Sequence, residues 1–135
     1  MLTIPTFVME SRTHGLGLFA ADHIVGGSVV WQYVPDFDRY VSQTLYASLP
    51  DPARRFLDFY GNVNTHGDIL ICADDARFMN HSSVPNVSAA GDVNVALRDI
   101  NVGEEILCEY SEFDAKFNGE FFRLILPVNG VTIQR

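Results

Sequence analysis

The apolar residues of this chain come in short runs that are separated by turn-forming residues. Each run is four to seven residues long and is bounded mostly by glycine, proline, asparagine or aspartate, which is typical of β-strands. Two of the runs flank Gly91-Asp92, a pair that favours a tight hairpin turn. The pattern predicts a mainly β fold, with strands at residues 16–20, 28–34, 68–73, 87–90, 93–97 and 105–110.

The segment from residue 38 to residue 60 has a different, helical spacing of its apolar residues. Pro50-Asp51-Pro52 lies inside it and predicts the start of a second helix, because proline is tolerated in the first turn of a helix. We therefore expect a small helical insert in the β fold, with apolar positions at Tyr40, Leu45, Leu49, Phe56, Leu57 and Tyr60.

The length of 135 residues fits one domain, and we expect residues 1–135 to form a single one. The first twelve residues predict an edge strand and not a signal peptide, since no basic segment precedes their short apolar run. No apolar run approaches the roughly 18 residues that a membrane span requires. We therefore expect no membrane partner.

The chain has a formal net charge of −8. Phosphate backbones are bound by lysine and arginine, so this charge argues against direct nucleic-acid binding. An acidic surface suits a basic protein partner. Cys72 and Cys108 are the only cysteines, too few for a four-cysteine zinc site or a disulfide scaffold. They indicate a cytoplasmic protein with two buried thiols and no metal site.

Residues 14–19 read His-Gly-Leu-Gly-Leu-Phe. Two glycines around one residue allow a backbone to pass close to a ligand. However, the third glycine of a dinucleotide-binding fingerprint is missing, and no βαβ pattern surrounds the segment. Taken alone, the segment fits a plain tight turn better than a binding loop.

Residues 77–86 read Arg-Phe-Met-Asn-His-Ser-Ser-Val-Pro-Asn and lie between apolar strands. Asn80 and His81 offer donors and acceptors that could read a purine edge or a carboxylate. Taken alone, His81 fits a structural role better than a ligand contact. Ser82 adjoins His81 without a nucleophile elbow, which argues against a catalytic Ser–His pair.

Residues 103–110 read Gly-Glu-Glu-Ile-Leu-Cys-Glu-Tyr. Taken alone, they indicate a turn that leads into a half-buried strand ending in a core tyrosine.

Together and in this order, the three segments resemble the SET-domain family of protein lysine methyltransferases. That family opens with a glycine-flanked loop followed by Leu-Phe, as residues 15–19 do. Its central signature, Arg-Phe-x-Asn-His-Ser-Cys-x-Pro-Asn, is matched at residues 77–86 with one substitution. Its last motif, Gly-Glu-Glu-Leu-x-Phe-Asp-Tyr, is resembled at residues 103–110. The resemblance covers residues 11–113.

The resemblance implies the β-clip fold of the SET domain, in which short sheets surround a pseudoknot formed by the Asn-His and tyrosine segments. It implies a protein-lysine N-methyltransferase that uses S-adenosyl-L-methionine (SAM) and acts on a basic protein such as a histone or histone-like protein. By this match Tyr110 is catalytic, and the cofactor-binding residues are His14, Gly15, Leu16, Gly17, Asn80 and His81. Arg77 would support the site, Phe113 or Phe117 would cap the cofactor, and the insert at residues 38–60 would border the substrate groove.

Two positions depart from the family pattern. Ser83 stands where many members have a cysteine that joins three downstream cysteines around zinc, and no cysteine follows Cys108. We therefore expect a zinc-free C-terminal closing segment at residues 114–135, completed by its own phenylalanines or by a second subunit in a homodimer. Cys108 stands where the family often has Phe or Tyr, and its smaller side chain suggests room for di- or trimethylation.

The alternative to an enzyme is a catalytically inactive SET-like module that binds protein. Asn80, His81 and Tyr110 together favour the enzyme, because a binding module has no chemical need for all three. A hydrolase built on asparagine and histidine would lack a nucleophile. The resemblance suggests a short stand-alone protein of bacterial or viral type, which is cytoplasmic, or nuclear or host-directed if it modifies a histone. Residues 104–120 contain six carboxylates and could dock a basic segment.

Overall fold

The computed structural model describes residues 1–117 of the chain. The expected closing segment at residues 114–135 therefore lies outside the described residues from position 118 onward. Within residues 1–117, the longest helix has ten residues, and no helix is long and apolar enough to cross a membrane.

The first two strands form a sheet of their own. Strand β1 (Thr6–Glu10) pairs antiparallel with β2 (Leu16–Ala20), with Thr6 opposite Ala20. The expected N-terminal edge strand is confirmed, and β2 has the predicted bounds. Four of the five residues of β2 are buried, and Leu18 is fully buried in the main core.

A five-stranded sheet forms the centre of the molecule, in the order β3-β9-β8-β10-β7. The predicted hairpin is confirmed, because β8 and β9 pair antiparallel across Gly91-Asp92. The predicted strand at residues 105–110 is shorter than expected, since Tyr110 begins a 3-10 helix instead. The strands are β3 (Val29–Gln32), β7 (Asn80–His81), β8 (Val87–Ser88), β9 (Val93–Ala96) and β10 (Leu107–Cys108).

Strand β10 lies between β7 and β8 and runs parallel to both, although β7 and β8 follow each other in the sequence. The late segment thus passes through the loop that joins the two earlier strands. Asn86 holds this crossing: its side-chain amide donates to the Glu105 carbonyl at 2.8 Å, and its Oδ1 accepts from Leu107 N–H at 2.9 Å. This arrangement is the expected pseudoknot.

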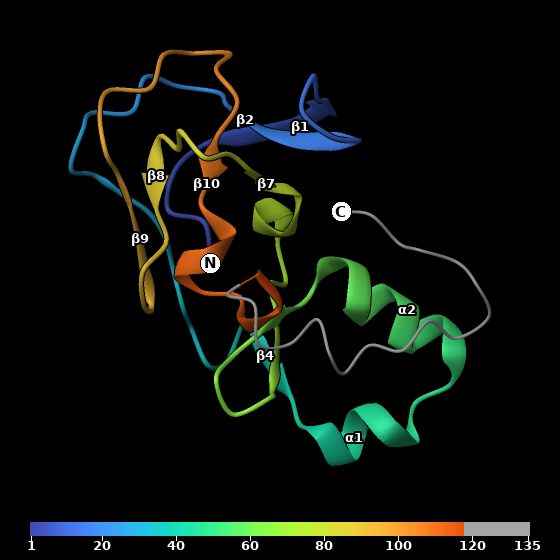
Figure 1. The fold of residues 1–135 in the computed structure, drawn as a ribbon. Coiled ribbons are helices and arrows are strands. Elements are labelled where there is room, and N and C mark those ends of the chain that lie inside the picture. The colour runs from blue at the N-terminus through green and yellow to red at the C-terminus, as the bar shows by residue number, and fades with distance from the viewer. Residues whose placement is uncertain (118–135) are drawn as a thin grey trace.

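The helical insert packs on a small third sheet. That sheet has the order β4-β6-β5, with β4 (Arg39–Val41), β5 (Asn62–Val63) and β6 (Ile69–Ile71). Two helices, α1 (Gln43–Ser48) and α2 (Asp51–Tyr60), connect β4 to β5. The start of the second helix is confirmed, but Tyr40 lies in β4 and not in a helix, because it pairs with Leu70 across the sheet. Figure 1 shows both helices at the end of the molecule opposite β1 and β2.

The packing separates into two hydrophobic clusters. The main one joins β2, the five-stranded sheet and the segment before β10, and it includes Leu18, Val30, Ile100, Ile106 and Tyr110. The second joins α2 to the small sheet through Leu57, Val41, Val63, Ile69 and Ala115. The described residues also form three short 3-10 helices, η1 (Asp75–Phe78), η2 (Tyr110–Glu112) and η3 (Ala115–Phe117). Tyr110 of η2 belongs to the main cluster, and Ala115 of η3 belongs to the second.

Candidate active site

Two pockets in the described structure share part of one wall. The larger has a volume of about 400 Å³, and the smaller has about 70 Å³. The larger volume is in the range of small-molecule sites. Three residues line both pockets: Tyr60, Arg77 and Tyr110. Tyr110, the residue predicted to be catalytic, therefore stands between a ligand-sized pocket and a narrow one.

Several contacts fix the position of Tyr110. Its phenol donates a 2.7 Å hydrogen bond to the Met79 carbonyl, and its backbone N–H donates to Nδ1 of His81 at 3.2 Å. The Phe113 and Phe117 rings meet the Tyr110 ring edge-on, at 5.7 Å and 5.1 Å between centroids. The residue is only 7% exposed, so its hydroxyl is held in one place.

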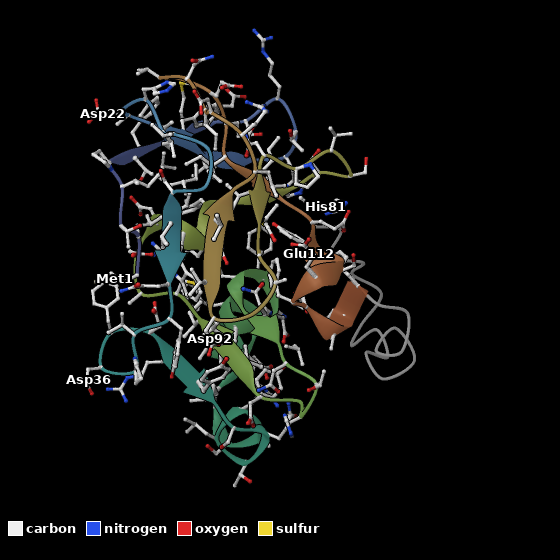
Figure 2. The ribbon with its side chains drawn as sticks, turned by 90° about the vertical axis from the view of Figure 1, so that its left-hand side faces the viewer. Met1, Asp22, Asp36, His81, Asp92 and Glu112 are labelled. Carbon is white, nitrogen blue, oxygen red and sulfur yellow. The ribbon has the colours of Figure 1, made fainter. Side chains whose placement is uncertain are left out.

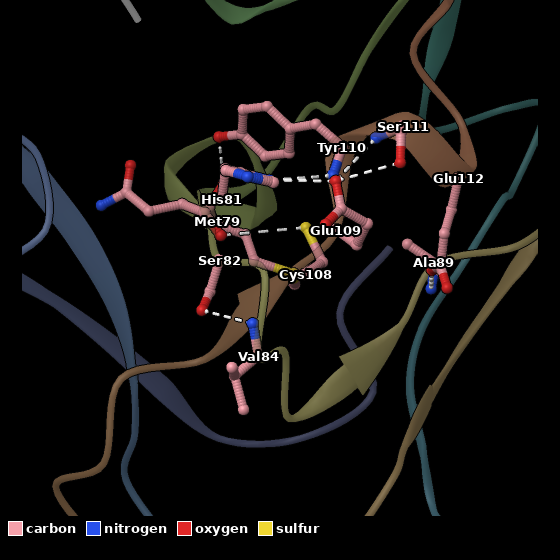
Figure 3. A network of polar contacts seen from close by, with 11 residues as sticks. Met79, His81, Ser82, Val84, Ala89, Cys108, Glu109, Tyr110, Ser111 and Glu112 are labelled. Carbon is pink, nitrogen blue, oxygen red and sulfur yellow. Dashed lines mark hydrogen bonds and ion pairs between the residues drawn. The ribbon is translucent and has the colours of Figure 1, made fainter. Parts of the chain in front are cut away.

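His81 connects Tyr110 to a neighbouring carboxylate, as Figure 3 shows. Its Nδ1 lies 3.4 Å from Glu109 Oε1. The hydrogen bond that Glu109 accepts from Ser111 N–H lowers the pKa of this carboxyl, and the His81 ring contributes in the same direction. Because Nδ1 accepts from Tyr110 N–H, Nε2 is the ring nitrogen that remains to meet a ligand.

Asn80 organises the loop that precedes β2. Its Nδ2 donates to the carbonyls of His14 at 2.9 Å and Leu16 at 3.0 Å, and to Glu105 Oε1 at 3.0 Å. His14, Gly15, Leu16, Asn80 and His81 all line the large pocket. The structure therefore brings together five of the six predicted cofactor-binding residues with Tyr110.

Gly17 is the sixth predicted cofactor-binding residue, and its surroundings differ from those of the other five. It is not among the residues that line the large pocket. A Cβ at this position would lie 2.3 Å from Glu105 Oε1 and 3.0 Å from the Ser11 Cβ. Position 17 is glycine because a carboxylate packs directly on its backbone. Gly15 differs, since its φ of +49° is a left-handed conformation that glycine adopts readily.

Glu105 is a candidate functional residue that the sequence motifs did not identify. Its carboxylate accepts from Ser11 Oγ at 2.7 and 2.9 Å as well as from Asn80. Ser11 Oγ in turn accepts from the backbone N–H of Thr13 and of His14. Glu105 thus ties the loop at the large pocket to the pseudoknot.

The end of α2 supplies aromatic side chains to the large pocket, which the sequence did not reveal. Phe59 and Tyr60 line it together with Phe78 of η1, and their rings contact one another edge-on. The Arg77 guanidinium lies over the Phe78 ring at 4.7 Å and donates to the Asp74 carbonyl at 3.1 Å. The insert was expected to border the substrate groove, and its Tyr60 lines both pockets.

The two aromatic residues suggested as caps lie at different pockets. Phe117 lines the large pocket, where its ring stacks on His81 at 6.4 Å with an interplanar angle of 18°. Phe113 lines the small pocket. No group of three His, Cys, Asp or Glu side chains within residues 1–117 is arranged to hold a metal ion.

The carboxylates at residues 104–114 are engaged in internal contacts. Glu112 accepts from Ala89 N–H at 2.7 Å, and Glu104 pairs with Arg98 at 3.1 Å. Asp114 accepts from Val63 N–H and lies 3.6 Å from the Lys116 ammonium. These carboxylates therefore have partners within the fold, and Glu120 lies outside the described residues.

Both cysteines line the small pocket. Burial raises the pKa of the Cys72 thiol to about 12, and the Asp38 and Asp74 carboxylates add to the effect. Cys108 is 2% exposed, lies two residues before Tyr110 in the sequence and lines the small pocket together with it. The wall also contains Trp31, Leu70, Met79 and Ala89, so it is largely apolar.

The fold and the site define a class of protein in which a ligand-sized pocket and a smaller, largely apolar pocket share a wall that contains Tyr110, next to a threaded segment. The model of the SET domain matches residues 15–111, and the chain belongs to this family of methyltransferases. A search of curated proteins found no match.

Solved structures of SET-domain methyltransferases share the fold. A Plasmodium falciparum protein assigned as a histone methyltransferase superposes with a TM-score of 0.58 at 18% identity, covering 81% of this chain and 95% of that chain. A humanized mutant of the Chaetomium thermophilum Polycomb Repressive Complex 2, bound to an inhibitor, gives a TM-score of 0.61 at 20% identity. That match covers 83% of this chain but 15% of the larger chain. The mainly β SET-domain fold is confirmed.

Proposed function

We propose that this SET-domain protein is a SAM-dependent protein-lysine N-methyltransferase. The observation that carries the proposal is the position of Tyr110 in the wall shared by the two pockets. The large pocket would hold the methyl donor, and the small pocket would hold the target lysine. The reacting atoms would then meet beside a fixed phenol.

The donor set of the large pocket fits the chemical groups of SAM. Aromatic rings of Phe59, Phe78 and Phe117 can stack on adenine. The carbonyls of His14 and Leu16 each retain acceptor capacity for an ammonium group, since a carbonyl oxygen has two lone pairs. The Arg77 guanidinium is suited to the carboxylate. When bound, SAM supplies an electrophilic methyl group on a sulfonium centre.

The small pocket suits an uncharged amine. A free lysine has a pKa of about 10.4, so making it neutral at pH 7 costs about 4.6 kcal/mol. The apolar wall formed by Trp31, Leu70 and Met79 would disfavour the ammonium form and lower that cost. The released proton can pass to bulk water before the amine enters.

Tyr110 would orient the amine and not deprotonate it. Its hydroxyl proton is donated to Met79, so the phenol oxygen can act toward an amine only as an acceptor. A hydrogen bond accepted from the amine N–H would aim the nitrogen lone pair at the large pocket. This positioning is the main catalytic contribution that we assign to the chain.

SAM binding measured by calorimetry tests the proposal first. We expect binding by the wild type that weakens in His81→Ala, because that ring lines the large pocket. His66→Ala is the matched control, since His66 lies in an exposed turn outside both pockets. Transfer of a labelled methyl group to basic proteins, histones included, then tests the substrate class. A well-folded protein that binds no SAM at millimolar concentration would overturn the proposal in favour of a protein-binding module.

A further inference from the structure

The end of helix α2 is held by a lysine of η3, the last described helix. The Lys116 ammonium donates to the Gly61 carbonyl at 2.8 Å and to the Asp58 carbonyl at 3.3 Å, and it lies 3.6 Å from the Asp114 carboxylate. The side chain of Lys116 is 13% exposed and that of Asp114 is fully buried. We call these four groups the α2 clamp. Helices η2 and η3 lie on the same side of the molecule as His81 (Figure 2).

The clamp supplies what the end of α2 lacks. The last carbonyls of a helix have no partner within the helix, and its C-terminus carries a partial negative charge. Helix α2 has no basic residue in its own last turn. A lysine side chain can hydrogen-bond such carbonyls, and Lys116 does so from 55 residues beyond Gly61. The end of α2 is therefore fixed by a distant part of the chain.

Asp114 connects the clamp to Tyr110. Its backbone N–H donates to the Tyr110 carbonyl at 2.9 Å. Its carboxylate accepts from the backbone N–H of Val63 at 3.2 Å and from that of Lys116 at 3.1 Å. One buried residue therefore joins the segment of Tyr110, the start of η3 and strand β5, which follows α2.

The two carbonyls of the clamp flank the part of the insert that reaches the site. Of the residues of α1 and α2, only Phe59 and Tyr60 line the two pockets of the described structure. Asp58 directly precedes this pair and Gly61 directly follows it. Lys116 itself lines neither pocket. The ammonium thus holds the backbone on both sides of the two rings without touching the space that a ligand would fill.

We propose that Lys116 is a positioning residue for methyl transfer, which sets the place of the Phe59 and Tyr60 rings in the wall of the large pocket. This inference rests on the proposed function and adds to it a residue that would touch neither ligand. Aromatic stacking depends on ring geometry, so displaced rings would hold the methyl donor less tightly. A small shift of the donor also slows transfer, because the reacting atoms must be closely aligned.

The test must separate the clamp from the burial of a charge. Lys116→Met alone would leave the Asp114 carboxylate buried without this counterion, which destabilises a fold. The change is therefore made in the Asp114→Asn background, where that charge is absent and the Asn oxygen can still accept from Val63 N–H. The Asp114→Asn/Lys116→Met variant is compared with Asp114→Asn at a temperature where circular dichroism shows both fully folded.

We expect the double variant to bind SAM roughly fivefold or more weakly than Asp114→Asn, and its kcat to fall roughly 10-fold or more. A loss of folded protein would instead lower the number of sites seen by calorimetry and leave the Kd of the folded molecules unchanged. Lys116→Gln in the same background is a milder second variant, because it keeps one neutral donor. Its SAM Kd should rise roughly two- to threefold.

Arg54→Met is the matched control, because it removes a cation that pairs with Asp51 at the other end of the same helix, outside both pockets. It should change neither Kd nor kcat by more than about twofold. Unchanged Kd and kcat in the folded double variant would overturn the proposal and leave the clamp a purely structural contact. A wild type that binds no SAM would overturn the proposed function.

Hydrogen exchange gives a readout that does not depend on turnover. Gly61 N–H donates to the Leu57 carbonyl at 2.7 Å, and this last turn of α2 is where the clamp acts. Exchange at residues 57–63 should be roughly 10-fold or more faster in the double variant than in Asp114→Asn, with no change in β3 or β9. Equal exchange would overturn the clamp itself. Faster exchange in the double variant, together with a wild type that transfers no methyl group, would support the clamp and contradict the proposed function.

Discussion

The phenol of Tyr110 donates a 2.7 Å hydrogen bond to the carbonyl of Met79, the residue directly before Asn80. This bond links the two segments that cross in the pseudoknot, at the level where the two pockets meet. A residue near the end of the described chain is thereby held against the segment that lines the cofactor-sized pocket.

Tyr110→Phe should separate binding from chemistry. The variant keeps the ring packing against Phe113 and Phe117 but loses the oxygen that would accept from the amine. We expect SAM affinity within about twofold of wild type and a fall in kcat of about 100-fold or more. Loss of one buried hydrogen bond should reduce the free energy of unfolding by about 1 kcal/mol. Calorimetry with steady-state kinetics checks this, and full activity in the variant would contradict the role of Tyr110.

Cys108→Phe should limit the number of methyl groups that are added. The thiol is buried in the wall of the small pocket next to Tyr110, and a phenyl ring would occupy part of that space. We expect di- or trimethyl product from the wild type at exhaustive conversion and mainly monomethyl product from the variant, measured by mass spectrometry. Only monomethyl product from the wild type would refute the idea. A thermal melt of the variant checks that the larger side chain is tolerated, since overpacking a core costs about 1–3 kcal/mol.

The parts of the fold that could be predicted are those with local signals. Strand β2 follows from an apolar run bounded by glycine, and the β8–β9 hairpin follows from Gly91-Asp92 between two apolar runs. Tyr40 was misassigned because its spacing fits a helix, whereas its pairing with Leu70 depends on a strand thirty residues away. The threading of β10 between β7 and β8 was available only through family resemblance, since Asn86 makes its contacts across the crossing.

The candidate site likewise contains residues that a sequence motif identifies and residues that only the folded structure identifies. His14, Asn80, His81 and Tyr110 could be named because their motifs match the family. Glu105 and the aromatic end of α2 could not, because their importance lies in contacts between distant segments. Gly17 could be named from the loop motif, but its close contact with the Glu105 carboxylate could not, because Glu105 lies far away in the sequence.

Gly17→Ala should therefore act through Glu105. The new Cβ would force the carboxylate away and break its bonds to Ser11 and Asn80, at a cost of about 1–3 kcal/mol in unfolding free energy. The same change should weaken SAM binding, because Asn80 holds the loop carbonyls.

A double-mutant cycle identifies the cause. The effects of Gly17→Ala and Glu105→Ala should be clearly less than additive, since both break the same contacts. Gly15→Ala is the control, because it has open space around its Cβ and suffers only from its left-handed φ. Its effect should add to that of Glu105→Ala. Additive behaviour in both pairs, measured by urea unfolding, would contradict this account of Gly17.

Phe117→Ala and Phe113→Ala should affect different steps. Phe117 stacks on His81 in the large pocket, whereas Phe113 lines the small pocket. Loss of one stacking ring is worth about 1 kcal/mol, so Phe117→Ala should weaken SAM binding by roughly fivefold or more. Phe113→Ala should instead raise KM for the peptide. Calorimetry and peptide kinetics on both variants check the division, and equal losses of SAM affinity would contradict it.

Alkaline pH should destabilise the protein through Cys72. Burial raises the pKa of this thiol from 9.0 to about 12, so above pH 9 the unfolded chain releases a proton that the folded protein retains. The stabilisation is fully present below pH 9 and is lost as the pH rises toward 12, by at most about 1.4 kcal/mol per pH unit. Cys72→Ala removes this group while the tyrosines that titrate nearby remain. Urea unfolding between pH 8 and pH 11 should therefore give a shallower decline for Cys72→Ala than for the wild type, and parallel curves would show that the buried thiol does not govern the alkaline limit.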